Sequence, residues 1–328
     1  MSSSITVVCD DALTRKEPLV SVCIITYNQA EYIEEAVDSV LEQQVDFEYE
    51  LIIGDDRSTD GTREILKRYQ RAHPDRIRLN LHDEHYDGIP ARKNMVVNLE
   101  SARGKYVALL DGDDYWISPD KLQRQTEFLE AHPEVSLSSH DSLIVLEGKA
   151  AEDSYGRSGK VYESELHPSA MSEDRYLDVD EVINQKTDEG ESFSIPAGSM
   201  VFRREFFDPV PDWYWKVWYG DRVMQMYCAS HGPVYYHSDL KSCYRRNERS
   251  VMIQFEGTMD HIRARIDEVR VLSNAVPSYD QKHQMLNPAY RSKMVAHWRK
   301  GQLLRATLAF GRSVFHHACY RLQKALDS

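Results

Sequence analysis

Short strand-like runs alternate with helical stripes over the first 146 residues of the chain. The runs lie at residues 20–26, 50–53, 77–81 and 106–110. Between them, apolar residues recur at the three- and four-residue spacing of one helix face. This alternation predicts an α/β fold, in which a mostly parallel central sheet is flanked by helices. Such sheets bind their ligands at the carboxyl ends of the strands.

The charge balance argues against nucleic acid as a partner. The chain has 53 acidic and 40 basic residues, a formal net charge of −13, whereas a nucleic-acid-binding protein must neutralise phosphates. No stretch approaches the roughly 18 consecutive apolar residues of a membrane-spanning helix, and the N-terminus lacks a secretory pattern. The five cysteines are scattered along the chain. We therefore expect reduced thiols and a cytoplasmic protein.

Changes in composition divide the chain into three parts. These are an N-terminal extension (1–17), a main domain (18–250) and a C-terminal helical region (251–328). The main domain divides further into the alternating half (18–146), a polar insertion (147–192) and a second ordered half (193–250). The insertion is either a solvated surface loop or hairpin, or a mobile loop over the site.

Three carboxylates, Asp111, Asp113 and Asp114, follow the apolar run at residues 106–110. Carboxylates packed this closely repel one another unless a cation compensates their charge. Mg²⁺ and Mn²⁺ prefer oxygen ligands, and Mg²⁺ typically combines one or two carboxylates with phosphate oxygens. The pattern predicts a Mn²⁺ or Mg²⁺ site that holds a diphosphate. The alternative is a solvated acidic turn.

A second acidic cluster follows the run at residues 50–53. Asp55 and Asp56 stand where a carboxylate can accept a hydrogen bond from a nucleobase or from a ribose hydroxyl. The sequence of residues 58–60, Ser-Thr-Asp, also suits a helix start, because these residues cap helices well. Both interpretations can hold together, since the cap builds the loop from which Asp55 or Asp56 reaches a ligand.

Four motifs carry a resemblance to a known family. They are Val20-Ser-Val-Cys-Ile-Ile-Thr-Tyr-Asn28, Asp55-Asp-Arg-Ser-Thr-Asp-Gly-Thr62, Ala91-Arg-Lys-Asn94 and Gly104-Lys-Tyr-Val-Ala-Leu-Leu-Asp-Gly-Asp-Asp114. In this order they resemble the family 2 glycosyltransferases, which have the Rossmann-like GT-A fold. The resemblance covers residues 18–146 and implies a domain that binds a nucleotide sugar.

The resemblance also implies site residues at the matching positions. It places the nucleotide at Thr26, Asn28, Asp55, Asp56 and Arg92, where Arg92 would meet the nucleobase or a phosphate. It places the metal and the sugar at Asp111, Asp113 and Asp114. The Asn-x-Gly that usually precedes the third motif is replaced here by Tyr86-Asp-Gly88.

The second half resembles the family more faintly. Residues 196–204, which include Ser199, resemble the segment that lines the acceptor side, and residues 243–247, which include Arg245, resemble a stretch found in bacterial members. Asp221 matches the family's general base, unless it only caps the helix expected at residues 221–230. The aromatic residues around it would remove it partly from water and favour its role as a base. Trp218, in that aromatic run, either stacks on sugar rings or belongs to the core.

Together these features imply a metal-dependent, inverting glycosyltransferase. It would move a sugar from a nucleotide-diphosphate sugar, with UDP as the expected nucleotide, to a hydroxyl of a glycan or lipid-linked acceptor in surface-polysaccharide synthesis. One alternative is a non-catalytic nucleotide-sugar-binding module with a degenerate site. A second is a sugar-1-phosphate nucleotidyltransferase, which would need a glycine-rich turn with Arg and Lys where this chain has Thr-Tyr-Asn-Gln-Ala at residues 26–30.

The C-terminal residues 289–328 are basic and amphipathic. One interpretation is peripheral contact with anionic lipid, which suits an enzyme with a lipid-linked acceptor. The other is packing against the acidic main domain.

Overall fold

The computed structural model describes much of the chain up to residue 246. The described residues are 5–9, 17–86, 89, 91–146, 162–166, 171–185, 187, 193, 195–217 and 220–246. The helical region expected over residues 251–328, and with it the lipid contact considered for residues 289–328, lies outside the described residues. None of the helices described is long and apolar enough to cross a membrane.

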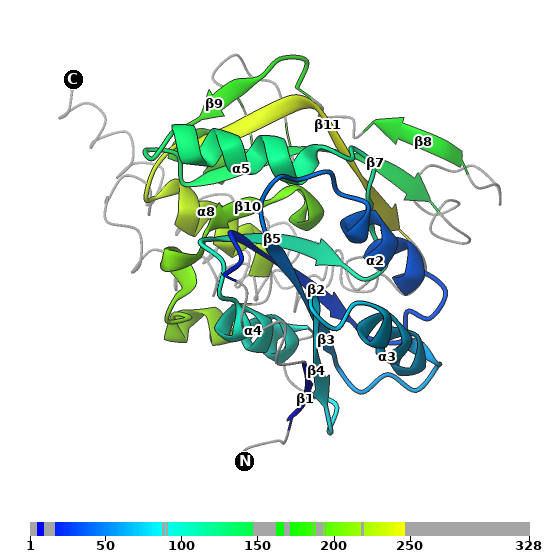
Figure 1. Ribbon diagram of the computed structural model, residues 1–328. Helices are drawn as coiled ribbons and strands as arrows, with labels where there is room; N and C mark the ends of the chain where they lie inside the picture. The colour runs from blue at the N-terminus through cyan, green and yellow to red at the C-terminus, as the bar shows by residue number, and fades with distance from the viewer. Residues whose placement is uncertain are drawn as a thin grey trace, which may run out of the picture.

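One sheet runs through the described part of the chain, in the strand order β1-β4-β3-β2-β5-β10-β7-β11-β6 (Figure 1). Its parallel half consists of β2 (Val20–Thr26), β3 (Tyr49–Asp55), β4 (Ile77–His82) and β5 (Tyr106–Asp111). These are the four strands expected from the sequence, so the α/β fold class is confirmed. β1 (Ile5–Val8), in the expected N-terminal extension, pairs antiparallel with β4 at the edge of the sheet.

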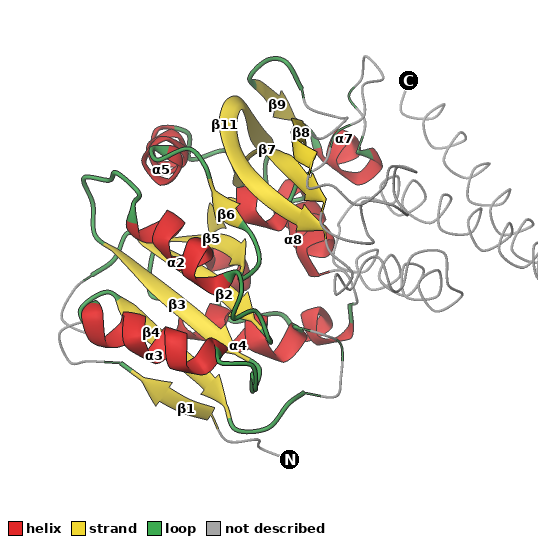
Figure 2. Ribbon diagram, turned by 90° about the vertical axis from the view of Figure 1, so that its right-hand side faces the viewer, coloured by secondary structure: helices red, strands yellow, loops and turns green. Residues whose placement is uncertain are grey.

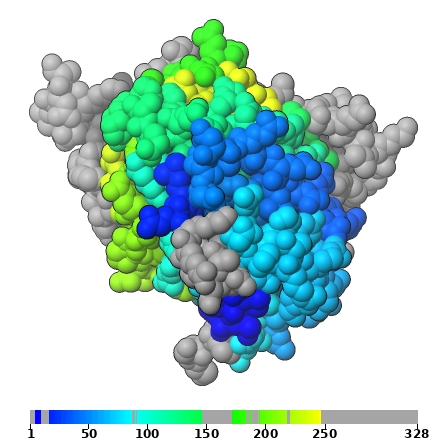
Figure 3. Space-filling model, in the orientation of Figure 1, coloured from blue at the N-terminus to red at the C-terminus, as the bar shows by residue number. Residues whose placement is uncertain are grey.

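Helices cover both faces of this sheet (Figure 2). One face carries α2 (Ile33–Leu41), α3 (Thr62–Ala72) and α5 (Lys121–Ala131), and the other carries α4 (Arg92–Ser101) and α8 (Gly220–Ala229). The side chains of a strand alternate between the two faces. Val22 and Ile24 accordingly belong to one buried cluster and Cys23 to the other. Helices α2, α3 and α5 form much of the surface seen in Figure 3.

The second half of the sheet mixes strand directions. β10 (Val201–Arg203) is antiparallel to β5 and to β7 (Leu137–Leu146). β11 (Val234–Arg246) is parallel to β7 and antiparallel to the short β6 (Tyr115–Trp116). Three 3-10 helices lie before β10 and between β10 and α8: η1 (Ala197–Ser199), η2 (Arg204–Phe207) and η3 (Asp212–Lys216).

The polar insertion contains regular structure in its described residues. β8 (Tyr162–Leu166) pairs with β7, and β9 (Arg175–Leu177) pairs with β11. The short helix α7 (Val179–Asn184) begins with a capping box between Asp178 and Glu181, a local signal that favours a helix start. The described part of the insertion therefore extends the sheet.

Candidate active site

The ends of β2, β3 and β5 lie at one edge of the sheet. In the strand register, Thr26 pairs with Asp55, and Ile25 pairs with Asp111. Because β2 lies between β3 and β5, the two acidic clusters flank the end of β2. The structure thus brings together residues that the sequence placed after three separate strands.

The turn after β5 concentrates negative charge. Asp114 is buried and Asp111 is half-buried. Burial and the nearby carboxylates of Asp113 and Asp221 raise the pKa of Asp111 to about 7. Burial and the charges of Asp113 and Asp111 also raise the pKa of Asp114 well above its usual range. A bound cation would compensate the repulsion between these carboxylates. Their oxygen atoms are the ligands that a hard divalent ion prefers.

Arg245 supports the acidic turn from β11. Its backbone N–H donates to Asp114 Oδ1 at 2.7 Å, and its Nη1 donates to the carbonyl oxygen of Asp113 at 2.7 Å. Its Nη2 forms an ion pair with Glu35 of α2. Arg245 was expected on the acceptor side. The structure places its guanidinium against the acidic turn.

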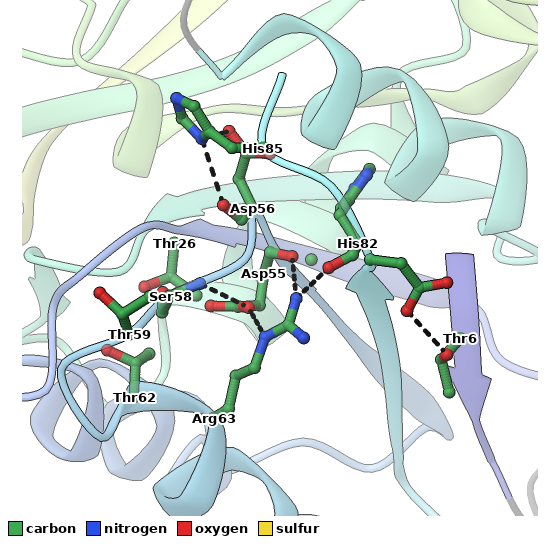
Figure 4. Close-up of polar contacts among 12 residues, drawn as sticks. Thr6, Thr26, Asp55, Asp56, Ser58, Thr59, Thr62, Arg63, His82 and His85 are labelled. Atoms are coloured by element: carbon green, nitrogen blue, oxygen red, sulfur yellow. Dashed lines mark hydrogen bonds and ion pairs between the residues drawn. The ribbon is translucent and has the colours of Figure 1, made fainter. Parts of the chain in front are cut away.

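The first carboxylate of the second cluster, Asp55, is held by the protein itself (Figure 4). It is fully buried. Its Oδ2 accepts the backbone N–H of Ser58 at 3.1 Å and forms an ion pair with Arg63 of α3. Arg63 also donates to the carbonyl oxygen of His82 at the end of β4. Asp55 therefore joins β3, the following loop and α3.

The second carboxylate, Asp56, lies beside an aromatic pair. Asp56 Oδ2 is 3.0 Å from Nδ1 of His85, and its Oδ1 accepts the backbone N–H of Tyr86 at 3.2 Å. The rings of His85 and the exposed Tyr27 stack with centroids 4.6 Å apart. Burial raises the pKa of Asp56, and His85 opposes this shift. Sequence reasoning assigned no role to either ring. Tyr27 stands beside Thr26 in the first motif, which was an available signal, but no spacing marks His85.

Unsatisfied polar atoms gather at the strand ends. Thr26 Oγ1 and Asp55 Oδ1 are buried and have no hydrogen-bond partner among the described residues. Asn28 has a left-handed φ of 52°, and its Oδ1 accepts the backbone N–H of Thr59 at 2.8 Å. The loop after β2 is thus tied to the loop after β3. Buried polar groups are usually paired, so a polar ligand at this edge would satisfy Thr26 and Asp55.

Asp221 lies in the first turn of α8, and its charge contributes to the raised pKa of Asp111. The two carboxylates therefore interact electrostatically, although they come from different halves of the main domain. Asp221 is exposed. The expectation that aromatic residues remove it partly from water is therefore wrong: Tyr214 is buried in the core and Trp215 is itself exposed.

The chain is similar in sequence to a known family and to several known proteins. Residues 21–209 match the family described as Glycosyl transferase family 2. The chain belongs to this family. It is 34% identical over 201 residues to Rv1520 of Mycobacterium tuberculosis, an uncharacterized protein, and these residues cover 59% of this chain and 51% of Rv1520. It is 45% identical over 117 residues to TuaG of Bacillus subtilis, which bears the name of a teichuronic acid biosynthesis glycosyltransferase. That match covers 36% of this chain and 44% of TuaG, so the chain spans about half the length of these curated relatives.

Two solved structures share the fold. TarS of Staphylococcus aureus, in complex with UDP-GlcNAc, has a TM-score of 0.57 and 18% identity, over 92% of this chain and 89% of that one. The mannosyltransferase PcManGT of Pyrobaculum calidifontis, in complex with GDP-Man and Mn²⁺, also has a TM-score of 0.57 and 18% identity. That alignment covers 95% of this chain and 81% of PcManGT. Both likenesses are in the fold, which agrees with the GT-A architecture expected for a family 2 chain.

Two further residues expected at this family 2 site are buried within the protein. Arg92 is buried, and its Nη2 donates to the carbonyl oxygen of Val217 at 2.9 Å. Ser199 is fully buried, and its hydroxyl donates to the carbonyl oxygen of Pro196 at 2.7 Å. Trp218 lies outside the described residues. Within the described chain, Arg92 and Ser199 therefore make contacts that stabilise the protein backbone.

A metal at this site would need oxygen ligands from a bound substrate in addition to the carboxylates of the protein. No group of three His, Cys, Asp or Glu side chains in the described part of the chain is arranged to hold a metal ion. The acidic turn offers Asp111 and Asp113, while Asp114 is engaged by Arg245. One or two carboxylates combined with phosphate oxygens is a usual arrangement for Mg²⁺. The family 2 site therefore fits a metal that binds together with a diphosphate.

Proposed function

We propose that this chain is a metal-dependent, inverting glycosyltransferase that moves a sugar from a nucleotide-diphosphate sugar to a hydroxyl group. The observation that carries the proposal is the strand register that brings Thr26, Asp55 and Asp111 to one edge of the sheet, where the charge of Asp221 also acts on Asp111. Asp111 ends a parallel strand, where the ligands of such sheets bind. Asp221 begins a helix from the second half of the chain and is open to solvent. A donor held at the first carboxylate and an acceptor held at the second would meet between them.

The nucleotide would bind at the ends of β2 and β3. Asp56 would accept a hydrogen bond from the nucleobase, and the rings of Tyr27 and His85 offer a stacking surface beside it. Thr26 Oγ1 and Asp55 Oδ1 supply further polar atoms at the same edge. UDP is the first expectation, because TarS binds UDP-GlcNAc. PcManGT binds GDP-Man, which makes GDP the second.

The metal would be held by Asp111 and Asp113. Mn²⁺ and Mg²⁺ both suit these oxygen ligands, and PcManGT contains Mn²⁺. When bound, such an ion acts as a Lewis acid that stabilises the charge of the departing diphosphate. The acidic turn would keep its shape through the two hydrogen bonds from Arg245.

Asp221 would act as the general base. The acceptor oxygen attacks the anomeric carbon of the donor sugar while Asp221 takes the hydroxyl proton. The bond between that carbon and the diphosphate oxygen breaks on the opposite face, so the configuration inverts. A positioned base typically accelerates a reaction by about 10²–10⁴-fold. The exposure of Asp221 leaves it accessible to an acceptor.

We further propose an acceptor that is a glycan or a lipid-linked glycan, at a cytoplasmic or inner membrane surface. The name of TuaG, which refers to teichuronic acid synthesis, supports a polymer of this kind. The charge balance supports the absence of nucleic acid among the substrates.

Thermal shift with a panel of nucleotides tests the donor site. UDP, GDP, dTDP and CMP would each be added with and without Mn²⁺. We expect one nucleotide to raise the melting temperature, more strongly with Mn²⁺, because a ligand that binds only the folded state stabilises it. The Asp111→Asn variant should lose the effect of Mn²⁺. No shift with any nucleotide at millimolar concentration would contradict the proposal.

A further inference from the structure

The first turn of α4 contacts both halves of the site. Asn94 Nδ2 donates to the carbonyl oxygens of Thr26 at 3.3 Å and of Gly54 at 2.8 Å. Arg92, two residues earlier, donates from Nη2 to the carbonyl oxygen of Val217 at 2.9 Å. A single helical turn thus links the ends of β2 and β3 to the segment that leads into α8.

The guanidinium of Arg92 is closely packed. Arg92 as a whole residue is 3% exposed, and the central carbon of its guanidinium lies 4.0 Å from the ring centroid of Tyr214, the geometry of a cation–π contact. A side-chain carbon added to Gly220 would lie 2.2 Å from Arg92 Nη1. Gly220 is therefore required if the guanidinium is to remain in this position against the start of α8.

The pKa of Tyr214 depends on the charged groups around this contact. Its hydroxyl donates to Met224 Sδ of α8 at 3.2 Å. Burial raises the pKa of Tyr214, Arg92 lowers it, and the carboxylates of Asp221 and Asp111 raise it. Arg92 therefore shares its surroundings with both carboxylates of the proposed reaction.

We propose that Arg92 is a positioning residue for the transfer step. By holding the Val217 carbonyl and packing against Gly220, its flat guanidinium fixes the start of α8 and therefore the location of Asp221. The inference rests on the proposed function, in which Asp221 is the base. It differs from the role implied by the family resemblance, in which Arg92 contacts the nucleobase or a phosphate.

Three single variants disturb the contact in different ways. Arg92→Ala removes the hydrogen bond and the ring contact. Arg92→Lys keeps the charge but loses the flat, forked group. Gly220→Ala displaces the guanidinium without changing Arg92 itself. For each variant we expect kcat for the release of UDP or GDP from its sugar nucleotide to be about 10- to 100-fold lower than in the wild type. Displacements of about 1 Å at reacting groups lower rates by this factor.

Nucleotide affinity separates positioning from binding. Isothermal titration with UDP and GDP, in the presence of Mn²⁺, should give dissociation constants for the variants within about twofold of the wild type, because only the rate step is disturbed. A tenfold weaker affinity in Arg92→Ala would assign Arg92 to the nucleotide and overturn the proposal. Arg71→Ala, at an exposed arginine of α3, is the matched control and should behave as wild type.

The double variant gives a second test. When Arg92 is alanine, the space beside Gly220 is free, so Gly220→Ala should cause no further loss of rate. Additive losses, or a wild-type rate in Arg92→Ala, would overturn the proposal.

Hydrogen exchange tests the same contact without any reaction. The backbone amides of residues 224–227, which bond to the carbonyls of the first turn of α8, should exchange faster in Arg92→Ala than in wild type or Arg71→Ala, because the start of α8 has lost its support. Unchanged exchange would overturn the proposal. If the wild type itself binds no nucleotide, the proposed function fails, and the exchange measurement still decides whether Arg92 holds α8.

Discussion

Arg245 and Asp114 are joined by a 2.7 Å hydrogen bond from a backbone N–H of β11 to a buried carboxylate oxygen of the β5–β6 turn. The same arginine donates through its side chain to the carbonyl oxygen of Asp113. Its cation is the positive charge that lowers the pKa of Asp114, against the burial that raises it. The acidic turn is therefore partly neutralised by the protein before any metal binds.

These contacts predict that a substitution of Arg245 lowers the stability of the protein more without a bound metal than with one. Arg245→Gln should lower the free energy of unfolding by about 1–3 kcal/mol in EDTA, since the positive charge beside the acidic turn and the side-chain hydrogen bond to the Asp113 carbonyl are lost, while the backbone bond to Asp114 remains. Saturating Mn²⁺ together with the stabilising nucleotide should narrow this difference, because the ion supplies the missing positive charge. Urea unfolding with and without the ligands measures both values. Arg68→Gln, which breaks an exposed ion pair with Glu34, should cost at most about 1 kcal/mol in either condition.

Asp55 and Asp56 should respond differently to the same substitution. Asp55→Asn breaks the ion pair with Arg63 and should cost about 1.5–3 kcal/mol of stability, the range for hydrogen bonds to charged groups. Asp56→Asn should leave the unfolding free energy within about 1 kcal/mol of the wild type but weaken nucleotide binding about 10-fold or more, because one charged hydrogen bond to the base is lost. Urea unfolding and calorimetric titration with the preferred nucleotide check the pair. Equal nucleotide affinities for Asp56→Asn and wild type would contradict the assignment.

The sequence predicted the strand ends of this site well, for a physical reason. Parallel strands leave their carboxyl ends at one edge, so the runs that precede Asp55 and Asp111 could be expected to end together from periodicity, whereas Thr26 was singled out by the family resemblance. Contacts made by long side chains between distant segments leave no such periodic signal. Arg92 lies in a motif resembling a nucleotide contact, but its guanidinium reaches Val217, which is far along the chain. His85 and Arg245 likewise contact partners that only the folded chain brings close.

The exposure of Asp221 makes its substitution a direct test of the chemistry. Asp221→Asn keeps the size of the side chain and removes its basicity, so we expect the transfer rate to fall about 10²–10⁴-fold. Nucleotide affinity should be unchanged, since the nucleotide is proposed to bind at β2 and β3. The measurement is sugar-nucleotide turnover beside calorimetric nucleotide binding. Asp212→Asn, at an exposed acid of η3, is the control, and a variant at Asp221 with wild-type turnover would rule out this base.

Two buried histidines predict how stability depends on acid. Burial lowers the pKa of His82 and of His237 from 6.5 to about 4. In His237, the ring Nε2 lies 3.0 Å from the hydroxyl of Ser138. The folded protein therefore keeps both rings neutral down to about pH 4, whereas the unfolded chain protonates them near pH 6.5.

At these two histidines the unfolded state binds more protons than the folded state throughout this window, so their contribution to stability must fall as the pH drops from 6.5 towards 4. The raised pKa values of Asp111 and Asp114 act in the opposite direction, because the folded state holds those protons more tightly than the unfolded state. A shift of this size corresponds to about 3 kcal/mol for each histidine at the acid end. Urea unfolding of the wild type and of His237→Gln at several values between pH 7 and pH 4.5 measures the slope. On acidification the variant should lose less stability than the wild type, because glutamine does not titrate. The slopes of unfolding free energy against pH should differ by the equivalent of up to about one bound proton. His231→Gln, at an exposed histidine, should keep the wild-type slope. Identical slopes for His237→Gln and the wild type would mean that His237 is protonated equally in the folded and unfolded chains.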